Sequence, residues 1–133
     1  MDYKIENILF VCTGNTCRSP IAEALFKKMI GTNASWVCSS AGTHTRDDLP
    51  ASLEAQIVVR DKGACLKNHK SRLLDDKIIS EADLILVMTQ GHKRFISERF
   101  NDINISSIPA RWIRRILLLT RCGLFIVNLV SNK

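Results

Sequence analysis

The sequence predicts an α/β fold, a three-layer sandwich with a central parallel sheet. The chain has 133 residues, of which 46% are hydrophobic, and this suffices for one domain with a substantial core. Short aliphatic runs have the length of buried strands, and segments with the apolar spacing of helices follow them. Strands that alternate with helices are typical of a mainly parallel sheet with helices on both faces. We therefore expect residues 1–133 to form a single domain.

The first predicted strand, residues 7–12, is an apolar run that ends at the turn-forming residues 13–15. A helix is expected to follow. Ser19 is its predicted N-cap and Pro20 its first helical residue, because serine caps helices and proline favours the first turn. Gly31 is the predicted end of this helix, since glycine commonly follows the last helical residue.

The remaining predicted elements continue the alternation of strands and helices. They are a strand over 36–40 closed by Ala41 and Gly42, a helix over 53–62 ended by Gly63, a short helix over 78–82, a strand over 84–88 and a helix over 93–100.

The net charge of +6 is unevenly distributed along the chain. Up to Asp102 there are 14 basic and 13 acidic residues, and after it there are five basic residues and no acidic one. A nucleic-acid-binding domain carries a basic face over its folded body. Because the excess here is confined to the last quarter of the sequence, we expect no nucleic-acid partner.

The sequence also bears on membrane and compartment. The apolar stretch 112–130 contains Arg114, Arg115 and Arg121, each costing about 2.5–3.5 kcal/mol at a bilayer centre, so we expect no membrane span. The charged N-terminus predicts no secretory signal peptide. The five cysteines include no Cys-x-x-Cys pair, which favours a reduced, cytoplasmic protein. Their spacing suggests no metal site, and no cofactor is implied.

The residues with the clearest chemistry lie between the first strand and the first helix. Cys12 and Arg18 are separated by five residues at the carboxyl end of a strand, where α/β sheets bind ligands. A loop of this length can turn its backbone N–H groups inward beside a helix N-terminus, which suits a tetrahedral oxyanion and favours a thiolate. Arg18 can bind two phosphate oxygens as a fork. Gly14 permits the positive φ that a tight loop requires, and Asn15 tolerates it.

This loop and three further segments resemble the low-molecular-weight protein-tyrosine-phosphatase family. The further segments are 39–43, 66–72 and 82–89, and the resemblance runs from about residue 7 to about residue 100. It implies a protein phosphatase that hydrolyses phosphotyrosine through a phosphocysteine at Cys12, with Arg18 stabilising the transferring phosphoryl group. The implied partner is a phosphorylated protein, and we expect a monomer or weak dimer.

The resemblance also assigns roles to the rest of the loop. The implied substrate-binding residues are Thr13, Gly14, Asn15, Thr16, Cys17 and Ser19. Asn15 and Ser19 are expected to hold the loop shape, and Ser19 to hydrogen-bond the Cys12 thiolate. Ser40 and His69 resemble members of a supporting polar network. Cys17 resembles a second loop cysteine that pairs with Cys12 under peroxide.

One loop position bears on the choice of substrate. The position of Thr16 is usually a bulky aliphatic residue in the tyrosine phosphatases of the family. A threonine here resembles the bacterial protein-arginine phosphatases, so the expected substrate is phosphotyrosine or phosphoarginine.

The sequence departs from the family pattern after residue 100. The family's Asp-Pro pair, whose Asp protonates the leaving group, is missing, and residues 110–133 are atypical. They represent either natural divergence or a shifted reading frame. We therefore expect impaired turnover, and the alternative function is a phosphate-binding module. Arsenate reduction is a weaker alternative, because no cysteine lies between Cys65 and Cys122.

Overall fold

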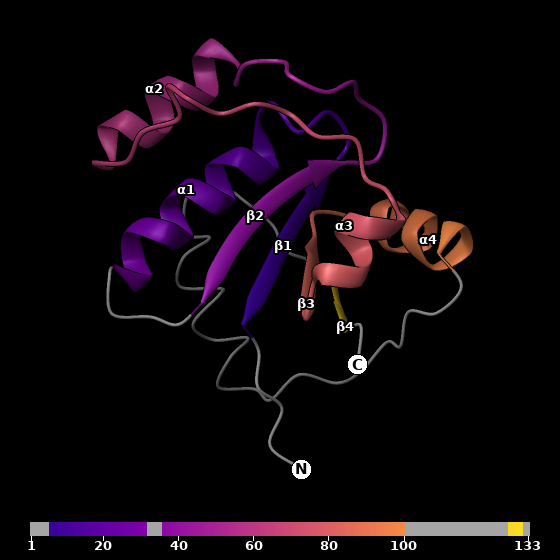
Figure 1. The fold of residues 1–133 in the computed structure, drawn as a ribbon. Helices are drawn as coiled ribbons and strands as arrows, with labels where there is room; N and C mark the ends of the chain where they lie inside the picture. The colour runs from indigo at the N-terminus through magenta and orange to yellow at the C-terminus, as the bar shows by residue number, and fades with distance from the viewer. Residues whose placement is uncertain (1–5, 32–35, 101–127, 132–133) are drawn as a thin grey trace.

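The computed structural model describes residues 6–31, 36–100 and 128–131, which form a sheet flanked by helices (Figure 1). The strand order is β2-β1-β3-β4. The central strand β1 (Asn7–Cys12) pairs in parallel with β2 (Val37–Gly42) and with β3 (Leu84–Val87). The predicted parallel sheet is thereby confirmed. A fourth strand, β4 (Asn128–Ser131), runs antiparallel to β3 and was not predicted from the pattern of the tail.

Four helices cover the two faces of the sheet. One face carries α1 (Arg18–Ile30) and α2 (Leu53–Asp61), and the other carries α3 (Asp76–Glu81) and α4 (Gln90–Arg99) (Figure 1). The connection from β1 to β2 includes α1, and the connection from β2 to β3 includes α2 and α3, since parallel strands cannot be joined by a tight turn. The predicted three-layer α/β architecture is confirmed.

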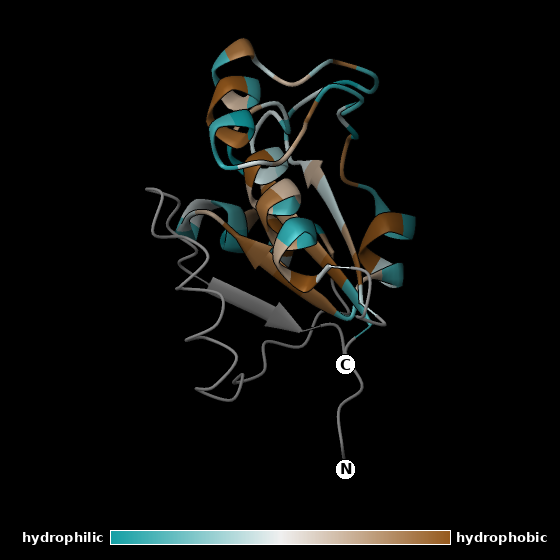
Figure 2. Cartoon of the chain, turned by 90° about the vertical axis from the view of Figure 1, so that its left-hand side faces the viewer, coloured by the Kyte–Doolittle hydropathy of each residue, from teal (hydrophilic) through white to brown (hydrophobic). Residues whose placement is uncertain are grey.

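Alternate residues of β1 supply two separate cores. Ile8 and Phe10 pack with residues of α1 and α2, whereas Leu9 and Val11 pack with residues of α3 and α4. Because successive strand side chains point to opposite faces, a strand buried on both faces is apolar throughout. Figure 2 shows β1 and β3 as largely hydrophobic and β2 as paler, since β2 contains two serines.

The start of α1 differs from the prediction. The helix begins at Arg18, with Cys17 as an N-cap that makes no side-chain capping bond, so the prediction of Ser19 as N-cap is wrong. The Ser19 hydroxyl lies instead 2.9 Å from the Cys12 Sγ, and the Asn15 side chain donates to it. The Ser19 side chain therefore stabilises the loop and does not cap the helix. The predicted end is confirmed, with Gly31 at φ 61°.

Other element boundaries shift by a few residues. β2 extends to Gly42 because its last residues pair with Val11 and Cys12 of β1. The last predicted helix begins at Gln90 rather than at residue 93, since the Thr89 hydroxyl caps it by accepting from the His92 N–H.

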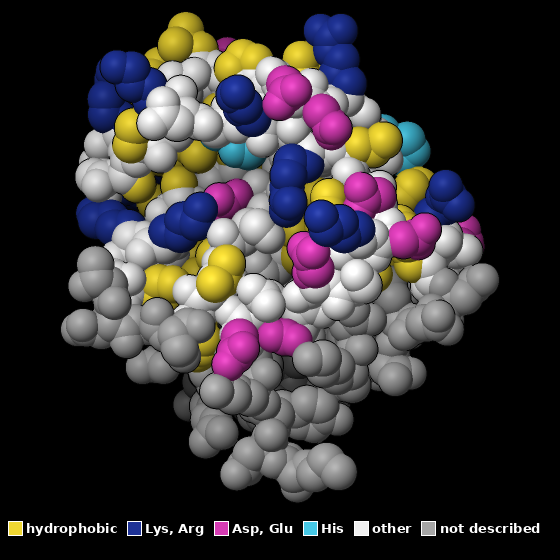
Figure 3. Space-filling model, in the orientation of Figure 1, with side chains coloured by type: hydrophobic (Ala, Val, Ile, Leu, Met, Phe, Trp, Pro, Cys, Tyr) yellow, Lys and Arg dark blue, Asp and Glu magenta, His cyan; other side chains and the backbone are white. Residues whose placement is uncertain are grey.

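The described surface carries mixed charge. On the face in Figure 3, basic and acidic side chains are interspersed rather than grouped by sign. In the part of the chain that the structure describes, no helix has the length and apolar character to cross a membrane. The apolar stretch 112–130 and most of the atypical segment 110–133 lie outside the described residues.

Candidate active site

The loop between β1 and α1 lies at the carboxyl ends of β1 and β2 (Figure 1). The segment after β2 continues alongside it, because the Thr43 N–H donates to the Cys12 carbonyl and the His44 N–H donates to the Thr13 carbonyl, each at 2.9 Å. On the side of α2, the Ser52 N–H donates to the carbonyl of Thr16 at 2.7 Å. Two separate segments of the chain therefore hydrogen-bond the backbone of the loop.

The thiol of Cys12 lies at the base of this loop. The residue is 2% exposed, and its Sγ lies 2.9 Å from the Ser19 hydroxyl and 3.2 Å from the Asn15 N–H. α1 starts six residues later at Arg18. Hydrogen-bonding groups and a helix N-terminus beside the sulfur are the surroundings in which nucleophilic cysteines occur. The arrangement suits a cysteine nucleophile.

Cys38 provides a contrast within the same fold. Burial raises the pKa of the Cys38 thiol well above its usual range, and the Glu23 carboxylate raises it further. A buried thiol of this kind stays protonated and unreactive. Cys12 is buried to a similar degree, but it is surrounded by donors.

The loop also leaves donors unpaired. Among the described residues, the backbone amides of Gly14, Thr16 and Cys17 donate to no protein acceptor. Arg18 is exposed beside them at the first turn of α1. Unpaired amides at a helix N-terminus next to a guanidinium can bind a tetrahedral oxyanion.

Asn15 connects this loop to distant parts of the chain. It is 0% exposed and has a φ of 54°. Its side chain donates to Ser19 and accepts from the Arg72 N–H, both at 2.9 Å, and its carbonyl lies 2.7 Å from His69 Nε2. Of the two residues expected to allow a positive φ, Asn15 adopts it and Gly14 does not. Asparagine tolerates this conformation when its side chain hydrogen-bonds locally.

The structure separates the predicted site residues into two groups. Thr13, Cys17 and Arg18 are exposed, and Gly14 and Thr16 are half-buried. Cys12, Asn15 and Ser19 are buried. The side chains of Asn15 and Ser19 therefore support the loop from the interior of the protein.

The supporting network is only partly as expected. His69 contacts the loop through the Asn15 carbonyl. The Ser40 hydroxyl does not reach the loop, because it donates to the Glu23 carboxylate on α1 at 2.5 Å.

Two residues of the site were not found from the sequence. His92, at the start of α4, lies with its Nε2 2.9 Å from the Thr13 hydroxyl. Gly42, at the end of β2, lies against the loop backbone. No local spacing signals either contact, since His92 is 79 residues from Thr13 along the chain.

Replacing Gly42 by alanine is expected to lower the free energy of unfolding by about 1–3 kcal/mol, because overpacking forces backbone to move. The new Cβ would lie 2.6 Å from the Thr13 carbonyl oxygen and 3.1 Å from the Asn15 Cβ. Urea denaturation measures this loss.

Gly14→Ala is the matched control for Gly42→Ala. Its Cβ would meet only the Thr16 hydroxyl, at 3.6 Å, and its φ is not positive. We expect a change in stability within about 0.5 kcal/mol, as for other substitutions that meet no close neighbour. Equal losses for the two variants would show that the close approach at Gly42 is unimportant.

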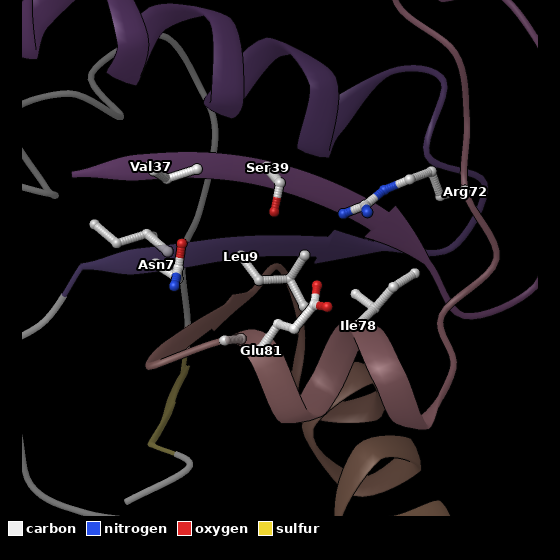
Figure 4. Close-up of a pocket in the computed structure, with 9 residues that line it drawn as sticks. Asn7, Leu9, Val37, Ser39, Arg72, Ile78 and Glu81 are labelled. Atoms are coloured by element: carbon white, nitrogen blue, oxygen red, sulfur yellow. The ribbon is translucent and has the colours of Figure 1, made fainter.

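A separate pocket of about 200 Å³ lies along β1 and β2 on the side of α3 (Figure 4). The side chains of Arg72 and Glu81 point toward it, and Leu9 and Ile78 form apolar walls. None of its lining residues is a cysteine. The Arg72 Nε donates to the Ser40 carbonyl at 3.1 Å, which fixes this side chain away from the loop. The pocket is therefore distinct from the thiol site.

Among the described residues, no group of three or more His, Cys, Asp or Glu side chains is placed to hold a metal ion.

Comparisons with known proteins agree with the geometry. The family model for low molecular weight phosphotyrosine protein phosphatases matches residues 7–108. A protein-arginine-phosphatase of Bacillus subtilis is 42% identical over 97 residues, which are 71% of this chain and 63% of the relative. The chain thus spans less than two thirds of that relative.

Two further proteins show how widely the likeness extends. An arsenate reductase of Staphylococcus aureus is 32% identical over 105 residues, covering 79% of this chain and 70% of the relative. The crystal structure of a low molecular weight protein tyrosine phosphatase from T. tengcongensis is 30% identical, with a TM-score of 0.68. That match covers 90% of this chain and 94% of the other.

Proposed function

Because the chain belongs to the low molecular weight phosphotyrosine protein phosphatase family, we propose that it is a protein phosphatase with Cys12 as its nucleophile. The observation that carries this proposal is the position of the Cys12 Sγ, between the Ser19 hydroxyl and the Asn15 N–H at the base of the loop. The thiolate sulfur attacks phosphorus, and a sulfur–phosphorus bond forms as the bond to the leaving group breaks. Water then attacks the phosphocysteine and releases phosphate and the thiolate.

The other loop residues support this reaction in different ways. Arg18 and the unpaired loop amides bind the phosphoryl oxygens, whose charge grows in the transition state. Ser19 hydrogen-bonds the thiolate when it departs from phosphorus in the second step. Asn15 keeps the loop in its strained conformation.

We propose phosphoarginine as the preferred phosphorylated residue and phosphotyrosine as the second. Thr16 is half-buried in the loop, with its hydroxyl near Gly14, and the Bacillus relative is a protein-arginine-phosphatase. A Cys12→Ser variant allows binding to be compared without turnover. Tighter binding of a phosphoarginine peptide than of the matched phosphotyrosine peptide supports this preference, and the reverse order contradicts it.

Turnover is proposed to be impaired, because the sequence after Asp102 contains no acidic residue to protonate a leaving group. Loss of a general acid typically costs about 10²–10⁴ in rate. We expect p-nitrophenyl phosphate to be hydrolysed at least about 100-fold faster than phenyl phosphate, since nitrophenolate leaves without a proton. The measurement is kcat/KM over a series of aryl phosphates.

A flat dependence of kcat/KM on the leaving group would show that a proton donor is present. A burst experiment with the same substrates distinguishes an impaired enzyme from the alternative function, a phosphate-binding module. A burst of product with phosphate trapped on Cys12 indicates an impaired enzyme, whereas oxyanion binding without a burst indicates the module.

Arsenate reduction is the less favoured reading, although arsenate reductases are among the relatives. Such thiol-dependent chemistry needs a downstream pair of redox cysteines near the strand that here spans residues 84–88, and no cysteine lies between Cys65 and Cys122.

We further propose that residues 1–133 act as one domain in the cytoplasm, as a monomer or weak dimer. The cysteines that the structure describes, at positions 12, 17, 38 and 65, are free thiols, which supports a reducing compartment.

A further inference from the structure

His92 is a buried titratable group that the proposed reaction does not use. It is 7% exposed, and its Nε2 lies 2.9 Å from the Thr13 hydroxyl, next to the nucleophile in sequence. Its Nδ1 is buried and has no hydrogen-bond partner among the described residues. A buried polar atom without a partner is rare and calls for an explanation.

The unpaired nitrogen indicates which tautomer is present. In a neutral histidine ring one nitrogen is a donor and the other an acceptor, and Nε2 is the ring nitrogen of His92 that has a partner. The proton of the neutral ring therefore belongs on Nε2, which donates it to the Thr13 oxygen. The hydroxyl hydrogen of Thr13 is then free to donate, and Thr13 is exposed at the loop.

We propose that His92 positions the Thr13 hydroxyl as a donor to the bound oxyanion, and that binding of a dianion is coupled to protonation of His92. This inference rests on the proposed function only in that the loop must bind an oxyanion. His92 acts through Thr13 and is a positioning residue.

The charges around the ring account for the coupling. Burial lowers the pKa of His92, and the Arg18 guanidinium of α1 and the His44 imidazole after β2 lower it further. The Cys12 thiol lies in the same loop. Without a ligand these groups favour the neutral form of the ring. A dianion beside Arg18 reverses the sign of the local charge, and an opposite charge within about 4–6 Å raises a histidine pKa by about one unit or more.

Sulfate is a suitable probe because it stays dianionic over the whole range of pH 5–8. The test uses the full chain with Cys12→Ser, so that the thiol does not titrate. Ring-nitrogen NMR follows the tautomer and pKa of His92, and calorimetry measures sulfate affinity. We expect saturating sulfate to raise the His92 pKa by about one unit. By linkage, the sulfate affinity rises about tenfold as His92 becomes protonated.

Two variants separate positioning from titration. His92→Gln keeps an amide donor toward Thr13 but cannot titrate, so it should bind sulfate normally at pH 8 and lose the tenfold increase at lower pH. His92→Leu removes the donor and should weaken binding about fivefold at pH 8. If His92 acts through Thr13, adding Thr13→Val to His92→Leu causes no further loss.

Several outcomes would overturn the proposal. If the pKa of His92 is unchanged in saturating sulfate, anion binding is not coupled to protonation of His92. If the losses of sulfate affinity caused by His92→Leu and Thr13→Val are additive, His92 does not act through Thr13. If sulfate does not bind at all, the proposed function fails together with the inference. If it binds without these effects, only the inference fails.

Discussion

Replacing Cys12 by serine is expected to lower the turnover of p-nitrophenyl phosphate by at least about 10⁴-fold, as loss of a nucleophile does in other enzymes. The reason is chemical, since a serine hydroxyl at this position has no base to take its proton. The Cys12 Sγ lies beside the Ser19 hydroxyl and accepts from the Asn15 N–H, and neither group is basic enough to take a proton from a serine hydroxyl. The measurement is steady-state hydrolysis at substrate concentrations above KM.

The same variant should still bind sulfate, because the unpaired loop amides and Arg18 are unchanged. Retained sulfate binding shows that the loop is folded, so that the loss of turnover reports on the nucleophile. Cys38→Ser is the matched control, since Cys38 lies away from the loop beside Glu23 and should leave turnover unchanged. Substantial turnover by Cys12→Ser would exclude the phosphocysteine route.

Replacing Arg18 by lysine is expected to lower kcat/KM by about 10²–10³-fold, the usual effect of removing one donor to a transition-state oxyanion. The positive charge is kept, but the planar fork that binds two phosphoryl oxygens is lost. Arg18 is also the first residue of α1, so its backbone position is held by the helix even when the side chain changes.

Arg60→Lys is the control for Arg18→Lys, because Arg60 is an exposed residue in the last turn of α2. It should leave kcat/KM unchanged. The effect of Arg18→Lys should appear in kcat more than in KM, since the phosphoryl charge grows in the transition state. Normal kcat with a raised KM would instead assign Arg18 to ground-state binding.

The local part of the site was predictable from the sequence because its residues lie close together along the chain. Cys12, Arg18 and the strand and helix around them lie within one short stretch, and the structure has them at the carboxyl end of β1. Ser19 shows where local reasoning fails. Its position before Pro20 predicts a helix cap. In the structure, however, the Ser19 hydroxyl hydrogen-bonds with the Cys12 Sγ and the Asn15 side chain.

The remote part of the site was not predictable from one sequence. Gly42 is needed because the Thr13 carbonyl lies where a Cβ would be, and this is a consequence of how β2 pairs with β1. His92 reaches Thr13 from the start of α4, which depends on the position of β3 beside β1. Contacts of this kind follow from the assembled sheet and leave no signal in spacing or periodicity.

The hydrogen bonds of Asn15 also have a consequence for how the protein is made. They join the loop to His69 and Arg72, which are 54 and 57 residues further along the chain. During synthesis the loop residues leave the ribosome well before these partners, and the left-handed conformation of Asn15 is unsupported in the meantime. Closing such long loops is entropically costly and comes late in folding. We therefore expect the loop that holds Cys12 to reach its final conformation only after β2 and the segment at 66–72 have docked.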